Sequence, residues 1–177
     1  VTGNSSGIVV LSAQPVKARG SEFSTNQIWG LKLQGDATLS ACTLASNVEG
    51  GMMFTGVNDS NLNFTNLTLS DNRTYGVFFD SSSVTVDRTV SSQLNISGSN
   101  YVFASTGGSL TMDGVSVQGG SVAGVYTYQG TLVAQGSTFS RNGYGVAADE
   151  STVTITNSNL SNNSVGFYSN RNNTVTA

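Results

Sequence analysis

The chain has 177 residues, of which 10% are charged, against about 25% in an average soluble domain. Serine, threonine, glycine and asparagine number 27, 20, 21 and 18, close to half of the chain. These short side chains favour turns and strands over helix interiors, so the composition argues against a helical bundle. With a net charge of −3, the chain has no basic stripe for nucleic acid, whose binding needs phosphate neutralisation.

The residue types that are missing exclude several kinds of catalytic and metal site. The chain contains no histidine and only one cysteine, Cys42, so it has no Ser-His-Asp triad, no histidine-based zinc site and no intrachain disulfide. No apolar run approaches the ~18 residues of a transmembrane helix, so we expect no membrane insertion by this segment. We also expect no metal and no other cofactor.

An internal repeat runs along the chain. An apolar residue is followed three positions later by Asn, and then by Gly and a second apolar residue. The five clear copies have Asn26, Asn47, Asn72, Asn142 and Asn163. The Gly-apolar step falls at residues 7, 30, 51, 76, 101, 124, 145 and 166, at intervals of 21 to 25 residues. Tyr101-Val102 takes this step in the fifth copy, and Gly120 replaces an Asn in the sixth.

Each repeat opens with two apolar residues that alternate with polar ones, which is typical of a strand with one face inward. In chain order these pairs are Val16/Ala18, Ala37/Leu39, Leu62/Phe64, Val84/Val86, Leu110/Met112, Leu132/Ala134 and Val153/Ile155, and Val175 begins another. One such repeat cannot bury its own apolar residues, but repeats stacked at about 4.8 Å can. The pattern therefore predicts an all-β parallel β-helix of about seven to eight rungs, as one domain over residues 1–177.

The recurring Asn and Gly predict tight corners between the strands. Asn tolerates the left-handed backbone conformation, and its side-chain amide can bond its copies in the coils above and below. Gly lets the chain bend without a Cβ clash.

The repeat resembles those of a known group of proteins. Phe23-Ser24-Thr25-Asn26, Phe139-Ser140-Arg141-Asn142 and Gly50-Gly51-Met52 are similar to the FxxN and GGA repeats of polymorphic outer-membrane proteins and autotransporter passengers. More broadly, all 177 residues resemble the pectin-lyase-like superfamily. This resemblance implies a single-stranded right-handed β-helix, secreted or at the cell surface, with adhesive or scaffolding work. Both ends interrupt a repeat, so we also expect a fragment of a longer solenoid, with the rest of that chain as a partner.

The strand after each Gly predicts an outward row of aromatic side chains. We expect Met53, Phe78, Phe103, Tyr126 and Tyr168 to face solvent, with Tyr75 and Tyr128 beside them. One hypothesis is that these residues bind a glycan or the surface of a partner protein. The alternative is that the rings only stack on one another, or lie beneath another segment of the full protein.

A polysaccharide lyase or hydrolase needs carboxylates or a base, and the best carboxylate pair is Asp87 and Asp113, with Arg88 next to the first. They occupy the same outward position on adjacent rungs, about 5 Å apart. These residues suit a polysaccharide lyase or hydrolase. The alternative is two solvated acids, and we expect a non-enzymatic protein.

Two further patterns are weaker. Thr152-Val153-Thr154-Ile155-Thr156 resembles the Thr-x-Thr arrays of ice-binding solenoids, although Lys17, Asn63 and Val133 interrupt the same row in other repeats. Glu150 and Arg171 occupy equivalent positions in adjacent repeats, which predicts a surface ion pair.

Overall fold

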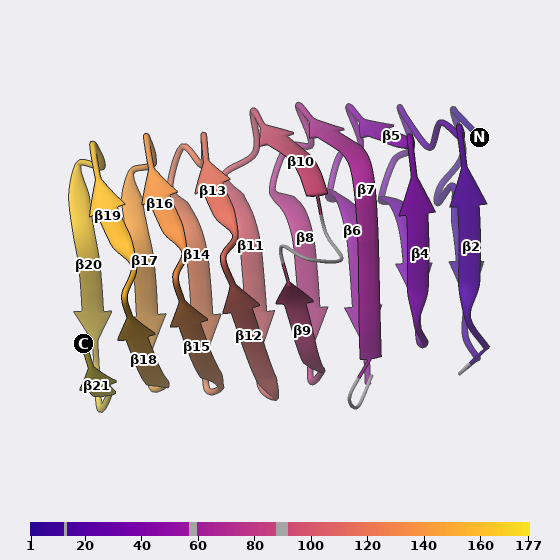
Figure 1. Ribbon diagram of the computed structural model, residues 1–177. Helices are drawn as coiled ribbons and strands as arrows, with labels where there is room; N and C mark the ends of the chain where they lie inside the picture. Colours follow the sequence, from indigo (N-terminus) through magenta and orange to yellow (C-terminus); the bar gives the residue numbers. More distant parts are fainter. Residues whose placement is uncertain (13, 57–59, 88–91) are drawn as a thin grey trace.

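The protein is a solenoid of parallel strands. The structure is a computed structural model that describes residues 1–12, 14–56, 60–87 and 92–177. Within these ranges the regular elements are β-strands, and no helix of membrane-spanning length and apolarity is present. The strands stack along one axis, with the N-terminus at one end and the C-terminus at the other (Figure 1).

Each coil contributes strands to up to three faces. Sheet 1 has eight strands, in the order β1 (Ile8–Val10), β3 (Trp29–Leu33), β6 (Gly50–Thr55), β8 (Tyr75–Asp80), β11 (Tyr101–Thr106), β14 (Ala123–Tyr128), β17 (Tyr144–Asp149) and β20 (Val165–Asn170). The main path of sheet 2 is β2 (Val16–Arg19), β4 (Ala37–Ser40), β7 (Ser60–Ser70), β9 (Ser83–Asp87), β12 (Ser109–Asp113), β15 (Thr131–Gln135), β18 (Thr152–Thr156) and β21 (Thr174–Thr176). On the third face, β5 (Thr43–Ala45) and β10 (Ser92–Ser97) pair with the second half of β7, and sheet 3 consists of β13 (Ser116–Gln118), β16 (Thr138–Ser140) and β19 (Asn159–Ser161).

Like residues lie in columns, because neighbouring coils pair in parallel register. Leu31 pairs with Met52, and Met52 with Val77, along sheet 1. Leu132 pairs with Val153, and Val153 with Val175, along sheet 2. The predicted all-β parallel β-helix of about seven to eight rungs is therefore confirmed.

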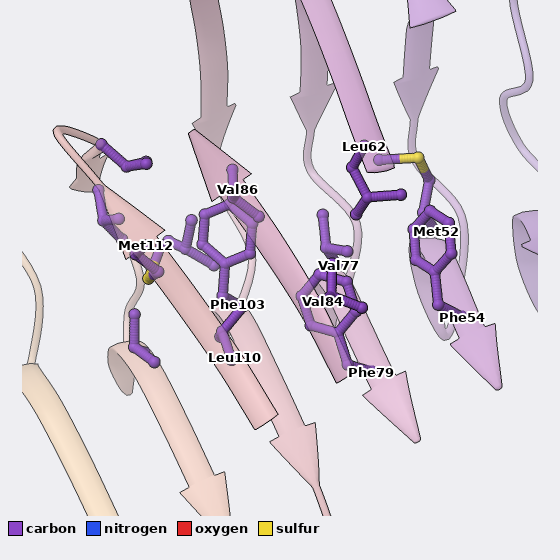
Figure 2. Packing of buried hydrophobic residues seen from close by; sticks show 14 of the residues in the cluster. Met52, Phe54, Leu62, Val77, Phe79, Val84, Val86, Phe103, Leu110 and Met112 are labelled. Atoms are coloured by element: carbon purple, nitrogen blue, oxygen red, sulfur yellow. The ribbon is translucent and has the colours of Figure 1, made fainter. Parts of the chain in front are cut away.

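The inward side chains form one continuous core along the axis (Figure 2). Phe54, Phe79 and Phe103 stack in adjacent coils, with ring centroids 5.5 and 6.4 Å apart. All three are fully buried, and Cys42 is buried as well. This core supplies the apolar burial that no single coil can reach alone.

The prediction that Phe103 faces solvent is wrong. Tyr101 pairs with Tyr75 and Phe103 pairs with Val77, so Val102 rather than Tyr101 takes the place of the repeated Gly. A displacement of one residue turns a strand side chain to the opposite face of the sheet. Phe103 therefore points inward, and Ala104 takes the outward position beside Phe78 and Tyr126.

Side-chain amides of the repeated Asn residues form a buried ladder. Oδ1 of Asn47 accepts hydrogen bonds from the backbone N–H and from Nδ2 of Asn26, both at 3.0 Å. Nδ2 of Asn47 donates to the carbonyl of Phe23 and to Oδ1 of Asn72, also at 3.0 Å. These three Asn residues are at most 1% exposed. The Asn47 amide thus joins its own coil to both neighbours, as the sequence predicts.

The left-handed corner lies one residue before the ladder, not at the Asn itself. A positive φ is found at Thr25, Ser46, Asp71, Gly98, Gly119, Arg141 and Asn162. Asn26, Asn47 and Asn72 do not have this conformation. The expectation that these Asn residues make the corner through the left-handed conformation is therefore wrong, and their role is the hydrogen bonding of the amide.

The repeated Gly leaves room for the ladder. A Cβ on Gly30 would lie 3.0 Å from Nδ2 of Asn47 in the next coil, and a Cβ on Gly145 would lie 2.7 Å from Nδ2 of Asn163. Neither glycine has a positive φ. Close approach of the next coil, by a backbone carbonyl as well as by the amide, therefore requires glycine here, and bending of the backbone does not.

The ladder is interrupted in the fifth and sixth coils. Ser99 and Gly120 occupy the Asn positions, and Oγ of the buried Ser99 has no hydrogen-bond partner among the described residues. Val102 takes the Gly position of the fifth coil, and Gly120 takes the Asn position of the sixth. A larger residue in the Gly column thus coincides with the smallest residue in the Asn column of the next coil.

Replacing Asn47 with Ala is expected to destabilise the solenoid strongly. The change removes four buried hydrogen bonds, and each buried group left unsatisfied costs about 1–3 kcal/mol. We expect a clear fall in the midpoint of urea unfolding, followed by circular dichroism. Asn4→Ala is the control, because within the described ranges that exposed side-chain amide donates to the Thr2 carbonyl alone. Similar shifts in both variants would contradict the structural role of the ladder.

Replacing Gly145 with Ala is expected to destabilise the chain, whereas Gly166→Ala is tolerated. A Cβ on Gly145 would lie 2.5 Å from the carbonyl oxygen of Gly166, and such overpacking costs roughly 1–3 kcal/mol. A Cβ on Gly166 has no atom closer than 3.6 Å. Thermal unfolding of the two variants side by side tests this difference, and equal melting temperatures would refute it.

Candidate functional site

Aromatic side chains gather on the outward face of sheet 1, in two neighbouring columns. The first column, at the start of the strands, is Trp29, Gly50, Tyr75, Tyr101, Ala123, Tyr144 and Val165. The second, three residues further along each strand, is Val9, Lys32, Met53, Phe78, Ala104, Tyr126, Ala147 and Tyr168. We call the seven rings of these columns the aromatic strip.

Five of the rings form one continuous stack across the coils. The Trp29 ring lies 6.0 Å from that of Tyr75 and 6.2 Å from that of Phe78, measured between centroids. Tyr75 also stacks on Phe78 at 4.9 Å and on Tyr101 at 5.7 Å. Tyr101 in turn contacts Tyr126 at 5.5 Å. Tyr144 and Tyr168 form a separate pair at 4.9 Å.

Small residues at some positions of the two columns leave gaps between the rings of the strip. A Cβ on Gly50 would lie 2.3 Å from Cζ3 of Trp29, so the indole covers this glycine. From Phe78 onward, the second column alternates between rings and small residues, since Ala104 and Ala147 lie between Phe78, Tyr126 and Tyr168. The surface is therefore not a uniform wall of rings.

A pocket of about 210 Å³ lies between the five-ring stack and the Tyr144–Tyr168 pair. Its lining includes Tyr101, Tyr126, Tyr144, Tyr168, Ala147, Asp149 and Asn170. Binding sites for drug-sized molecules measure about 300–1,000 Å³. The pocket therefore suits a single small ring or the end of a side chain.

Asp149, at the edge of the pocket, is held in place by an arginine of the next coil. Nε of Arg171 donates to Oδ1 of Asp149 at 3.0 Å, and Nη2 donates to Oδ2. The predicted ion pair between Arg171 and Glu150 is confirmed, at 3.4 Å. Sequence analysis missed Asp149, although Asp149 and Asn170 align in the register one residue before that pair. The result is a fixed carboxylate whose charge is largely balanced.

The structure places most of the predicted binding residues on one face. Met53, Phe78, Tyr126 and Tyr168 occupy the second column, Tyr75 occupies the first, and Tyr128 pairs with Asp149 alongside them. Phe103 does not belong to this group, because it is buried in the core. Trp29 was not among the predicted residues, although its place before Gly30 matches that of Tyr75 before Gly76. The binding role of these residues stays a prediction.

The predicted carboxylate pair is aligned on sheet 2. Asp87 pairs with Asp113, and Asp113 with Gln135 in the following coil. Asp113 is exposed, whereas the side chain of Asp87 and all of Arg88 lie outside the described residues. No group of three or more Asp, Glu, Cys or His in the described part of the chain is arranged to hold a metal ion. The catalytic hypothesis is therefore still a prediction.

Partial burial raises the pKa of two tyrosines of the strip above the usual value of 10.0. For Tyr75, desolvation is the main cause, followed by the neighbouring Tyr101 and Glu49. For Tyr126, desolvation is again the main cause, and Asp149 adds to it. Both phenols therefore keep their protons to higher pH in the folded chain than in the unfolded chain.

The stability of the fold is expected to fall as the pH rises above about 10. There the unfolded chain releases these protons before the folded chain does, so the free energy of unfolding decreases with pH. Tyr126→Phe removes one of the two groups and is expected to make this decrease shallower. Urea unfolding of both proteins between pH 8 and about 11 measures it. Identical slopes would disprove the assignment.

The chain matches one known protein family along its whole length. Residues 1–89 and 56–177 match the family described as "Right handed beta helix region". No curated protein and no solved structure matches the chain. The finer resemblance to pectin lyases and autotransporter passengers therefore stays a prediction, whereas the right-handed coil is confirmed. Because the two matched stretches together cover all 177 residues, the chain belongs to the right-handed β-helix family.

Proposed function

We propose that the chain is a structural and adhesive β-helix, secreted or displayed at a cell surface, whose aromatic strip binds a glycan. The single observation that carries this proposal is the outward position of the strip. Aromatic rings of a soluble domain usually lie in the core, whereas Phe78, Tyr126 and Tyr168 share a column on the solvent side of sheet 1.

The neighbouring column favours a glycan over the surface of a protein. Two residues beyond the second column, the strands carry polar side chains and one tyrosine, namely Thr55, Asp80, Thr106, Tyr128, Asp149 and Asn170. Apolar ring faces thus run beside a line of hydrogen-bonding groups. A sugar chain presents the same combination, with C–H faces on its rings and hydroxyl groups along its edges. Consecutive coils repeat at about 4.8 Å, which provides an extended surface for a chain-like ligand.

The competing explanation is that the rings only join neighbouring coils. The contacts of Trp29 with Tyr75 and of Tyr101 with Tyr126 do join coils, and each aromatic pair contributes about 0.5–1.5 kcal/mol. The two explanations predict different ligand affinities for variants that lack rings but still fold. A binding surface loses affinity when rings are removed, even where the fold survives.

The test is binding of the labelled 177-residue chain to an array of neutral and acidic oligosaccharides. We expect the wild type to bind and Tyr75→Ser/Phe78→Ser to lose at least about tenfold in affinity, since two stacked rings leave the surface. The matched control is Phe103→Leu, which removes a ring from the opposite face of the same sheet and is expected to lower the melting temperature alone. Loss of stability without loss of binding in the double variant would reject the glycan-binding role, as would a wild type that binds no oligosaccharide. Binding only to a protein partner would reject it too.

One observation favours an enzymatic alternative, namely the backbone pairing of Asp87 with Asp113. Two carboxylates are the catalytic pair of most glycoside hydrolases, and a carboxylate can also act as the general base of a polysaccharide lyase. Turnover of a uronic-acid polymer that is abolished by Asp87→Asn would establish this alternative. We expect no turnover, since our proposal is a non-enzymatic protein.

A further inference from the structure

The pocket lies where the aromatic strip departs from a continuous stack. In the second column Ala147 lies between Tyr126 and Tyr168, so two ring-bearing residues flank a position without a ring. Coils repeat at about 4.8 Å, which places the backbones of these tyrosines roughly 10 Å apart. A flat ring in contact on both faces needs about 7–8 Å, twice the usual carbon–carbon contact distance. The interval therefore has room for one ring.

The rings of Tyr126 and Tyr168 do not fill the interval themselves, because each packs against another tyrosine. Tyr126 leans on Tyr101 of the preceding coil, with centroids 5.5 Å apart. Tyr144 and Tyr168 lean on each other at 4.9 Å. The rings on both sides of the pocket are thus already paired with other tyrosines, and Ala147 lines the space between them.

One edge of the pocket is polar and fixed in position. Asp149 and Asn170 lie two residues beyond Ala147 and Tyr168 on the same strands, and both line the pocket. A carboxylate offers about four acceptor sites, of which Arg171 uses two, one on each oxygen of Asp149. The remaining sites can accept hydrogen bonds from a ligand, and the amide of Asn170 can both donate and accept.

We infer that this pocket is a subsite for one uncharged pyranose ring of the glycan, an inference that rests on the proposed function. The C–H faces of the ring pack against the tyrosines, and its hydroxyls donate to Asp149 and exchange hydrogen bonds with Asn170. An anionic sugar is disfavoured, because Asp149 and Glu150 together outnumber the single positive charge of Arg171. A quaternary ammonium ion also packs against ring faces, but it has no hydroxyl to donate to Asp149 and Asn170, so tetramethylammonium serves as the competing probe.

The test uses ligand-observed NMR on the 177-residue chain with simple probes. The neutral probes are methyl β-D-glucopyranoside, methyl β-D-galactopyranoside and methyl α-D-mannopyranoside, and the charged probes are methyl β-D-glucuronide and tetramethylammonium. We expect at least one neutral glycoside to bind, with a dissociation constant on the order of millimolar, and both charged probes to bind more weakly. Ala147→Ile fills the pocket and is expected to weaken binding at least tenfold. Thr154→Ile is the matched control, because it enlarges an outward residue of sheet 2 in the same coil.

Three results would overturn the inference: no binding of any neutral glycoside, unchanged affinity in a folded Ala147→Ile variant, or binding of tetramethylammonium alone. If Ala147→Ile fails to fold, Asn170→Ala removes an exposed polar group instead and is expected to weaken binding several-fold, and an unchanged affinity there also overturns the inference. The proposed function fails separately. If the wild type binds oligosaccharides on the array and Ala147→Ile binds them equally well, the strip binds glycans but the pocket is not a subsite.

Discussion

The buried amide ladder is the interaction on which the rest of this solenoid depends. Backbone pairing alone leaves the register of parallel strands free to slip, since every residue offers similar donors and acceptors. A buried Asn that must satisfy its amide from both neighbouring coils removes this freedom. The Gly column belongs to the same arrangement, because in the coils that carry the ladder a residue without Cβ leaves space for the amide and the backbone carbonyl of the next coil. Once the register is set, the inward and outward columns follow, and the aromatic strip is one of them.

The interruption of the ladder shows how the coils are joined where the amides are missing. Ser99 and Gly120 provide no amide, yet the two coils remain in contact on both sides of the sheet. Tyr101 packs against Tyr126 on the outside, and Oγ of Ser105 donates to Oγ1 of Thr127 at 3.2 Å in the interior. The aromatic strip therefore has a structural part in these coils, beside the binding role that we propose for it. Both roles use the same property, a large apolar face presented perpendicular to the strands.

The candidate site could be predicted in part from the sequence. The alternation of inward and outward side chains after each Gly was enough to place Phe78, Tyr126 and Tyr168 in one outward column. It failed at Phe103, because Tyr101 and Val102 are both compatible with the repeat, and only the pairing with Tyr75 decides between them. The pocket could not be predicted at all. It arises from the side-chain conformations that turn Tyr126 toward Tyr101 and Tyr144 toward Tyr168, which leave a pocket beside Ala147.

The sequence by itself determined that the chain is a solenoid, how many coils it has and which residues form the ladder. It could do so because these properties depend on a spacing of 21 to 25 residues that repeats along the chain. Only the tertiary structure showed which contacts require glycine in the Gly column, on which face Phe103 lies and that Asp149 pairs with Arg171. Each of these depends on which atoms of two adjacent coils come within contact distance, and a shift of one residue between the coils changes every such contact.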